Sequence, residues 1–179
     1  DDRIYFAGGT YLTGSTLLGE NITHNASIGV GVLAALDTSV STSVLWSRIF
    51  RSPILSNCLD LEMASDTMLI LAGVFRDSLY LSEDTLTGSA TDSYRFYLAA
   101  DTSGSIQYAK SFDVSSSGHS ISVAPDASFY SVFRFTGTFE LPNATVTASG
   151  TGDMAIVRCQ SDGTPIGVLQ CGPVETAMD

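Results

Sequence analysis

The stretch Ser120–Asp126 (SISVAPD), followed by Phe129–Phe133 (FYSVF), decides how this chain folds, because the same order of patterns occurs elsewhere in the sequence. Alternating small polar and apolar residues that lead to a Pro-Asp turn and then to an apolar run are typical of two adjacent strands. About sixty residues earlier, Leu59–Asp66 introduces the apolar run Met68–Leu71 in the same way. The chain therefore contains a β-type repeat of about sixty residues.

A third copy of the pattern is divided between the two ends of the sequence. Val174–Asp179 (VETAMD) resembles the first half of the repeat, and Asp1–Phe6 (DDRIYF) resembles the second half. We therefore expect the first repeat to lack its leading strand, which a strand from the other end of a second copy would supply. The expected donor strand comprises Val174, Glu175, Thr176, Ala177 and Met178, and the expected acceptor comprises Arg3, Ile4, Tyr5 and Phe6.

Each repeat is predicted to form four antiparallel strands. In the clearest copy, the second strand is Phe129–Leu141, the third is Met154–Cys159, and the return strand Ile166–Cys171 follows an Asp-Gly turn that supplies positive φ angles. We expect an all-β chain forming one unit over residues 1–179, with blade-like repeats at 1–54, 55–116 and 117–173 and a further leading strand at 174–179. A trefoil-like or sandwich-like β domain is the alternative fold.

The return strands of the first two repeats correspond residue by residue. Trp46 corresponds to Tyr108, and Arg48 corresponds to Lys110. Three segments from different parts of the repeat, Val44–Phe50, Asp101–Phe112 and Ser120–Tyr130, carry a resemblance to a known class of repeats. Over nearly the whole chain, the three degenerate copies of the repeat resemble the seven-bladed β-propeller repeat class of secreted and surface proteins. The resemblance implies blade-like sheets but no activity, because the class has no common catalytic residues, and three blades are fewer than a closed propeller needs.

Composition indicates a secreted glycoprotein. The chain has 25 serines, 18 threonines and 16 glycines, and its net charge of −11 argues against binding to nucleic acid or to anionic membrane surfaces. No apolar run reaches the ~18 residues that a membrane-spanning helix needs. Three of the four asparagines, Asn21, Asn25 and Asn143, lie in acceptor sequons. These features predict N-linked glycans and an extracellular or cell-surface location.

The three cysteines raise the question of a disulfide. In an oxidising compartment one pair could close. Cys159 and Cys171 flank a predicted hairpin and are the closest pair in sequence, so they are the disulfide candidates. Cys58 would then be a buried thiol or would pair with another chain.

No pattern in the sequence indicates catalysis or metal binding. His24 and His119 are the only histidines and lie in different repeats, so a histidine metal site lacks convergent ligands. Asp101–Gly104 and Ser161–Gly163 are explained by turn chemistry rather than by a calcium loop. The chain contains no Gly-x-Ser-x-Gly elbow and no phosphate-binding loop. We therefore predict no catalytic residues, no metal and no cofactor.

The sequence favours a structural function. An incomplete repeat exposes a sheet edge, and a free strand elsewhere in the sequence matches that edge. We expect a secreted, glycosylated assembly protein, whose copies associate head to tail into a ring or filament. The alternative is an extracellular carbohydrate-binding or adhesive module that uses exposed aromatic side chains. A glycosidase ranks third, because no pair of carboxylates supports it.

Overall fold

The computed structural model describes residues 3–10, 15–17, 20–22, 29–39, 43–82, 84–114 and 116–172. All of the regular structure in these residues is β-strand, and every strand pair is antiparallel. The predicted all-β class is therefore confirmed. Among the described residues there is no helix that is long and apolar enough to cross a membrane.

Three main sheets carry the fold. The first contains β1 (Arg3–Thr10), β4 (Val30–Asp37) and β5 (Ser43–Phe50). The second contains β6 (Leu55–Ser65), β7 (Met68–Arg76), β10 (Tyr94–Asp101) and β11 (Ile106–Asp113). The third contains β12 (Ser116–Val123), β13 (Phe129–Phe135), β16 (Asp153–Cys159) and β17 (Pro165–Cys171). Strands neighbour one another in chain order in each sheet, and the first sheet has three described strands where the others have four.

Each main sheet also carries a small hairpin between two of its strands. The hairpins are β2 (Ser15–Leu17) with β3 (Glu20–Ile22), β8 (Ser78–Tyr80) with β9 (Thr85–Thr87), and β14 (Thr138–Leu141) with β15 (Ala144–Thr147). The pattern in the sequence did not predict these hairpins. It predicted one continuous strand from Phe129 to Leu141, which is wrong, because the chain breaks at Gly137, where φ is +70°.

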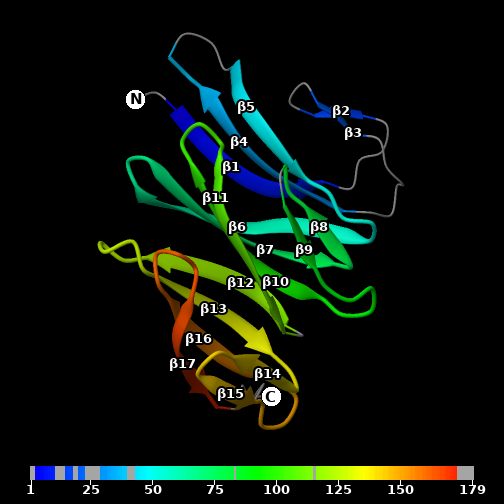
Figure 1. Ribbon diagram of the computed structural model, residues 1–179, viewed down its shortest axis with the longest axis vertical. Coiled ribbons are helices and arrows are strands. Elements are labelled where there is room, and N and C mark those ends of the chain that lie inside the picture. The colour runs from blue at the N-terminus through cyan, green and yellow to red at the C-terminus, as the bar shows by residue number, and fades with distance from the viewer. Residues whose placement is uncertain are drawn as a thin grey trace, which may run out of the picture.

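The three sheets follow one another along the longest axis of the molecule, with the first sheet at one end and the third at the other (Figure 1). A hydrophobic cluster that includes Leu33, Phe50 and Phe96 joins the first two sheets, and one that includes Tyr97 and Phe129 joins the second to the third. The middle sheet is covered on both faces, so every residue of β10 from Arg95 to Ala100 is buried. The described strands do not close into a ring.

Candidate functional site

The predicted acceptor segment lies at a sheet edge. Arg3–Phe6 forms the first half of β1, which pairs with β4 along its whole length. No described strand pairs with the other edge of β1, whereas β7 and β13, the strands in the corresponding position, pair on that side with β6 and β12. The predicted donor strand Val174–Met178 lies outside the described residues.

The structure places two of the three sequon asparagines on the small hairpins. Asn143 is exposed in the two-residue turn that joins β14 to β15, and Thr145 of its sequon is exposed as well. Asn21 lies in β3, on the corresponding hairpin of the first sheet. Asn25 lies outside the described residues. An exposed turn leaves the Asn143 side chain accessible to a glycosylating enzyme.

The expected Cys159–Cys171 disulfide is wrong. Cys159 is buried at the turn end of the β16–β17 hairpin, opposite Pro165, while Cys171 is exposed at the far end, opposite Met154. Five residues of strand separate the two positions, about 17 Å, which is far beyond the Cα separation of about 7 Å that a disulfide tolerates. Cys58 is also a free, buried thiol, and burial raises its pKa strongly.

The outer ends of the first two sheets are joined by an aromatic side chain, a cation and a tight turn. Trp46 of β5 donates a hydrogen bond from its indole nitrogen to the carbonyl of Thr102, over 3.0 Å. Arg48 donates from Nε to the carbonyl of Gly104, over 2.9 Å. The indole ring lies so close to Gly104 that a Cβ there would stand 2.8 Å from Trp46 Cε3. A glycine is therefore required where the ring covers the turn.

The same arrangement joins the second and third sheets. A Cβ at Gly163 would lie 2.7 Å from Cε2 of Tyr108. Lys110 donates to the hydroxyl of Thr164 and lies 3.6 Å from a carboxylate oxygen of Asp162. Both glycines have positive φ, +85° at Gly104 and +78° at Gly163. The correspondence of Trp46 with Tyr108 and of Arg48 with Lys110, predicted from the sequence, thus becomes one repeated contact.

At their inner side, the first two sheets are joined through small residues. Ser56 of β6 donates to the carbonyl of Phe50 and accepts from the backbone nitrogen of Gly31 over 3.1 Å. The thiol of Cys58 occupies the space beside Gly31, where a Cβ would lie 2.9 Å from Sγ. Glycine in β4 therefore allows β6 to approach the first sheet closely.

We call the interface between the first and second sheets the first joint, and that between the second and third sheets the second joint. At its inner side, the second joint is held by the hydrogen bonds of one carboxylate. Asp60 of β6 accepts a hydrogen bond from the Ser120 hydroxyl over 2.7 Å and another from the backbone nitrogen of Ile121 over 2.8 Å. A carboxylate that accepts from a backbone N–H makes a charge-assisted hydrogen bond, which is stronger than a neutral one. Asp60 thereby fixes β12 against the middle sheet.

A buried polar cluster that sequence reasoning missed lies inside the second joint. His119 Nε2 lies 2.7 Å from the Ser131 hydroxyl and 3.3 Å from the Tyr97 hydroxyl. Burial, with a smaller effect from Arg95, lowers the pKa of His119 to about 3, so the imidazole is neutral near pH 7. Ser131 is fully buried. The hydrogen bond between Ser131 and His119 is therefore part of the core.

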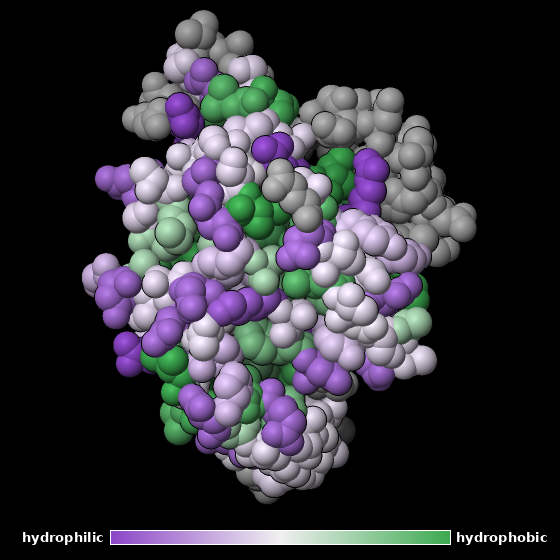
Figure 2. Space-filling view, in the orientation of Figure 1, coloured by the Kyte–Doolittle hydropathy of each residue, from purple (hydrophilic) through white to green (hydrophobic). Residues whose placement is uncertain are grey.

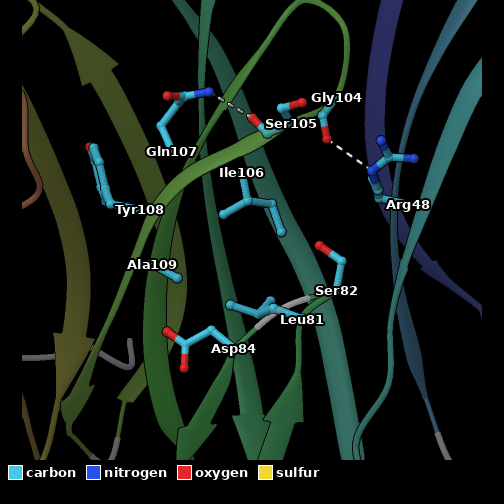
Figure 3. Close-up of a pocket in the computed structure, with 10 residues that line it drawn as sticks. All are labelled: Arg48, Leu81, Ser82, Asp84, Gly104, Ser105, Ile106, Gln107, Tyr108 and Ala109. Atoms are coloured by element: carbon cyan, nitrogen blue, oxygen red, sulfur yellow. Dashed lines mark hydrogen bonds between the residues drawn. The ribbon is translucent and has the colours of Figure 1, made fainter.

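A groove of about 510 Å³ runs along the outer side of the first joint, between β5 and β11 (Figure 3). Arg48 stands on one side of it and Asp84 on another, while Leu81 and Ile106 lie between them and Gln107 lies at the rim. An adjoining hollow of about 380 Å³ adds Arg51 and the half-exposed ring of Tyr80. The combined surface offers hydrogen-bonding groups beside an aromatic ring.

A second groove of about 510 Å³ occupies the corresponding place at the second joint. Lys110, Asp113 and Glu140 supply its charged groups, and Pro142 of the β14–β15 turn lines it next to the Asn143 sequon. The two grooves share their position between one outer strand and the next sheet. The sequence could not reveal them, because their walls come from segments about thirty to sixty residues apart.

Within the described part of the chain, no group of three or more His, Cys, Asp or Glu side chains could hold a metal ion. Comparison of the sequence with protein-family models and with curated proteins gives no match.

Proposed function

We propose that this chain is a building block of an extracellular assembly, in which copies join head to tail by strand completion. One observation carries the proposal: the edge of β1 has no described strand beside it, although β6 and β12 fill the equivalent place in the other sheets. The donor segment Val174–Met178 resembles the sequence around the end of β6, which supports the idea that it takes that place in a neighbouring copy.

The physical basis is the exposed backbone of a sheet edge. An edge strand presents unpaired N–H and C=O groups that a free strand from another chain can satisfy. Each backbone hydrogen bond formed in this way contributes about 0.5–1.5 kcal/mol net, so a strand of five residues supplies a modest but directional contact. We interpret the sheets as blades of the β-propeller type. Within each sheet the strands follow chain order outward from the leading strand, and the contact of Trp46 with Gly104 between the first two sheets is repeated by Tyr108 with Gly163 between the second and third.

The glycosylation site at Asn143 suits such an assembly. Asn143 lies on a small hairpin that stands apart from the edge of β1, at the opposite end of the strand order. Sugar on this turn would leave the joining edge uncovered while it keeps the surface hydrated. This placement supports a secreted or cell-surface location for the protein.

The test is to compare the full chain with a chain that ends at Gly172. We expect the full chain to form long polymers in sedimentation velocity and electron microscopy, and the shortened chain to stay monomeric with an unchanged circular dichroism spectrum. Polymers that persist without residues 173–179 would contradict strand completion. A mass near 18.9 kDa for the native protein, after removal of glycans, would support separate subunits. A much larger mass would mean that further repeats of the same chain cover the edge.

The outer grooves favour a second candidate function, the binding of carbohydrate. Saccharides are bound by polar side chains combined with an aromatic face, and Arg48, Gln107 and Tyr80 offer both. A glycan array, probed with and without calcium, tests this function. We expect binding to at least one glycan to be lost in Tyr80→Ala, whereas uniform non-binding of the unaltered chain would exclude it.

A further inference from the structure

The third sheet packs against the second with one face and leaves the other face open. Cross-strand pairing aligns two rows of residues on the open face, Tyr130–Arg158–Gly167 and Val132–Ile156–Leu169. Tyr130 is 40% exposed and Leu169 is 60% exposed, and Met154 on the same face is 37% exposed. The third sheet therefore exposes large apolar side chains to solvent.

Four of the six equivalent positions are buried in the second sheet, and the two in its last strand are half-buried. A register shift near the start of the last strand allows the two sheets to be aligned, because it follows Ala99 in one and Arg158 in the other. The equivalent rows of the second sheet are then Ile70–Ala99–Tyr108 and Ala72–Tyr97–Lys110. Ile70, Ala72 and Ala99 are 0% exposed, because the third sheet covers them. Positions that are buried in the second sheet are therefore more exposed in the third sheet.

The first sheet, at the other end of the molecule, also exposes apolar side chains at positions whose equivalents in the second sheet are buried or half-buried. Its register shift follows Ala35, which aligns the row Ile4–Leu36–Val44 with Leu69–Ala100–Ile106 of the second sheet. Leu69 is 1% exposed, and Ala100 and Ile106 pack into the cluster that faces the first sheet. Ile4, however, is 52% exposed and Val44 is 40% exposed. Val32 and Ala34, which share this face, are already buried, so the open part is the row that contains Ile4.

We propose that the open face of the third sheet in one copy packs against the Ile4–Leu36–Val44 row of the first sheet in the next copy. This inference rests on the proposed head-to-tail assembly and adds a second surface to it, beyond the strand edge. Figure 2 shows hydrophobic surface near the upper end of the long axis, over the first sheet, and at the lower left, over β16 and β17. The contact would bury apolar side chains between copies, as the two internal joints do within one copy, but without the outer aromatic contact, because Gly167 stands where Tyr108 does in the second sheet.

The charges on the open face favour this head-to-tail contact over pairing of two identical faces. Arg134 and Arg158 are both exposed there; Arg158 lies 5.9 Å from the ring centre of Tyr130 and 3.8 Å from a carboxylate oxygen of Asp126, which offsets part of its charge. Two third sheets placed face to face would bring these cations together. Each copy carries a net charge of −11, so a face with arginines lowers the repulsion between copies. A contact between two different faces produces a ring or a filament rather than a closed dimer.

The experiment uses two full-length variants, one for each end. Leu169→Glu places a charge on the open face of the third sheet, and Ile4→Lys places one on the exposed row of the first. Each variant alone should self-associate at least about tenfold more weakly than the unaltered chain, because an unpaired charge would be buried in every contact. Sedimentation velocity measures this, and circular dichroism checks the fold.

An equal mixture of the two variants should associate again, because the intact third sheet of Ile4→Lys meets the intact first sheet of Leu169→Glu. The matched control is a pair of exposed tyrosines: Tyr130→Glu should weaken assembly, and Tyr80→Glu, on the β8–β9 hairpin, should not. Two results overturn the inference. One is unaltered polymerisation of Leu169→Glu and Tyr130→Glu, and the other is a mixture that stays as weakly associated as its components.

The outcomes separate this inference from strand completion. Loss of assembly on removal of residues 173–179, combined with normal assembly of Leu169→Glu, would support strand completion and reject the packing of the third sheet against the first sheet of the next copy. Normal assembly without residues 173–179, combined with weakened assembly of Leu169→Glu, would support the packing of the two sheets and reject strand completion. An unaltered chain that sediments as a monomer at all concentrations would reject both.

Discussion

The two internal joints have the same contact at their outer side and different chemistry in their cores. At the outer side, Trp46 covers Gly104 in the first joint as Tyr108 covers Gly163 in the second. In the core, the first joint is filled by apolar side chains such as Leu33 and Phe96. The second joint encloses the neutral His119 with its hydroxyl partners. A repeat can therefore conserve how its units align while the interior of each joint changes.

The largest expected effect is the loss of stability when a core aromatic ring is removed from either joint. Comparing the two losses tests whether the joints contribute equally to stability. Phe96→Ala empties the first joint, where the ring meets Phe50 and Phe75 edge-on, and Phe129→Ala empties the second, where the ring meets Tyr97. Each change should lower the free energy of unfolding by about 3–5 kcal/mol. Chemical denaturation should still show one transition, because both joints share the middle sheet. Two separate transitions, or a loss below about 1 kcal/mol, would contradict this expectation.

The second prediction uses pH to distinguish the joints. His119 has its pKa lowered to about 3 in the folded chain, so the unfolded chain takes up a proton near pH 6.5 that the folded chain refuses. Stability is thus fully present above about pH 6.5 and is lost as the pH falls toward 3. Between about pH 7.5 and about pH 5 the loss should be about 2 kcal/mol.

His119→Gln keeps a polar group that can form a hydrogen bond with Ser131 and removes the titration, so its stability should be nearly constant over this range. Denaturation at each pH measures the difference. The measurement stays above about pH 5, because the carboxylates with lowered pKa values, such as Asp101 and Asp126, lose their contribution only at lower pH. Equal slopes for His119→Gln and the unaltered chain would show that His119 is not responsible.

The third prediction examines the shared outer contact. Gly104→Ala and Gly163→Ala should each cost about 1–2 kcal/mol of stability or more, from the positive φ and from the aromatic ring that the new Cβ meets. Gly137→Ala is the matched control, because Gly137 has φ of +70° but no atom within 4 Å of a new Cβ. If all three variants lose the same stability, the rings do not press on the turns.

The smallest effect compares the two cations. Lys110 forms a partly exposed ion pair with Asp162, so Lys110→Met should cost less than about 1 kcal/mol, and the cost should shrink in high salt. Arg48 bonds the neutral carbonyl of Gly104, so the cost of Arg48→Met should depend less on salt. Thermal melting at low and high ionic strength gives both numbers. The same salt dependence for both variants would contradict the distinction.

Much of the fold could be predicted from the sequence because repetition places the strands. The period of about sixty residues placed the leading segments at Leu59–Asp66 and Ser120–Asp126, which overlap β6 and β12, and the return strands after Asp101 and Ser161. The small hairpins were missed because strands of three or four residues, rich in Ser and Thr, have too little alternation to stand out from a connection.

The contents of the joints were harder to predict. His119, Ser131 and Tyr97 come from three strands, and although alternation places Ser131 on the same face as Phe129 and Phe133, the local sequence does not show that the three polar groups meet. The disulfide prediction failed because closeness in sequence was taken for closeness in space. In a hairpin, residues equally distant from the turn are neighbours, whereas Cys159 is next to the turn and Cys171 is at its far end.

The outer contact gives the row of sheets a direction. The middle sheet carries the aromatic side chain Tyr108 toward one neighbour and the glycine turn at Gly104 toward the other. A gene duplication of this segment alone would therefore yield two units that fit each other, with Tyr108 of the first above Gly104 of the second. The third sheet has Gly167 where the aromatic residue would stand, so it could not be copied in the same way. The middle sheet is the part of this molecule from which a longer protein could grow.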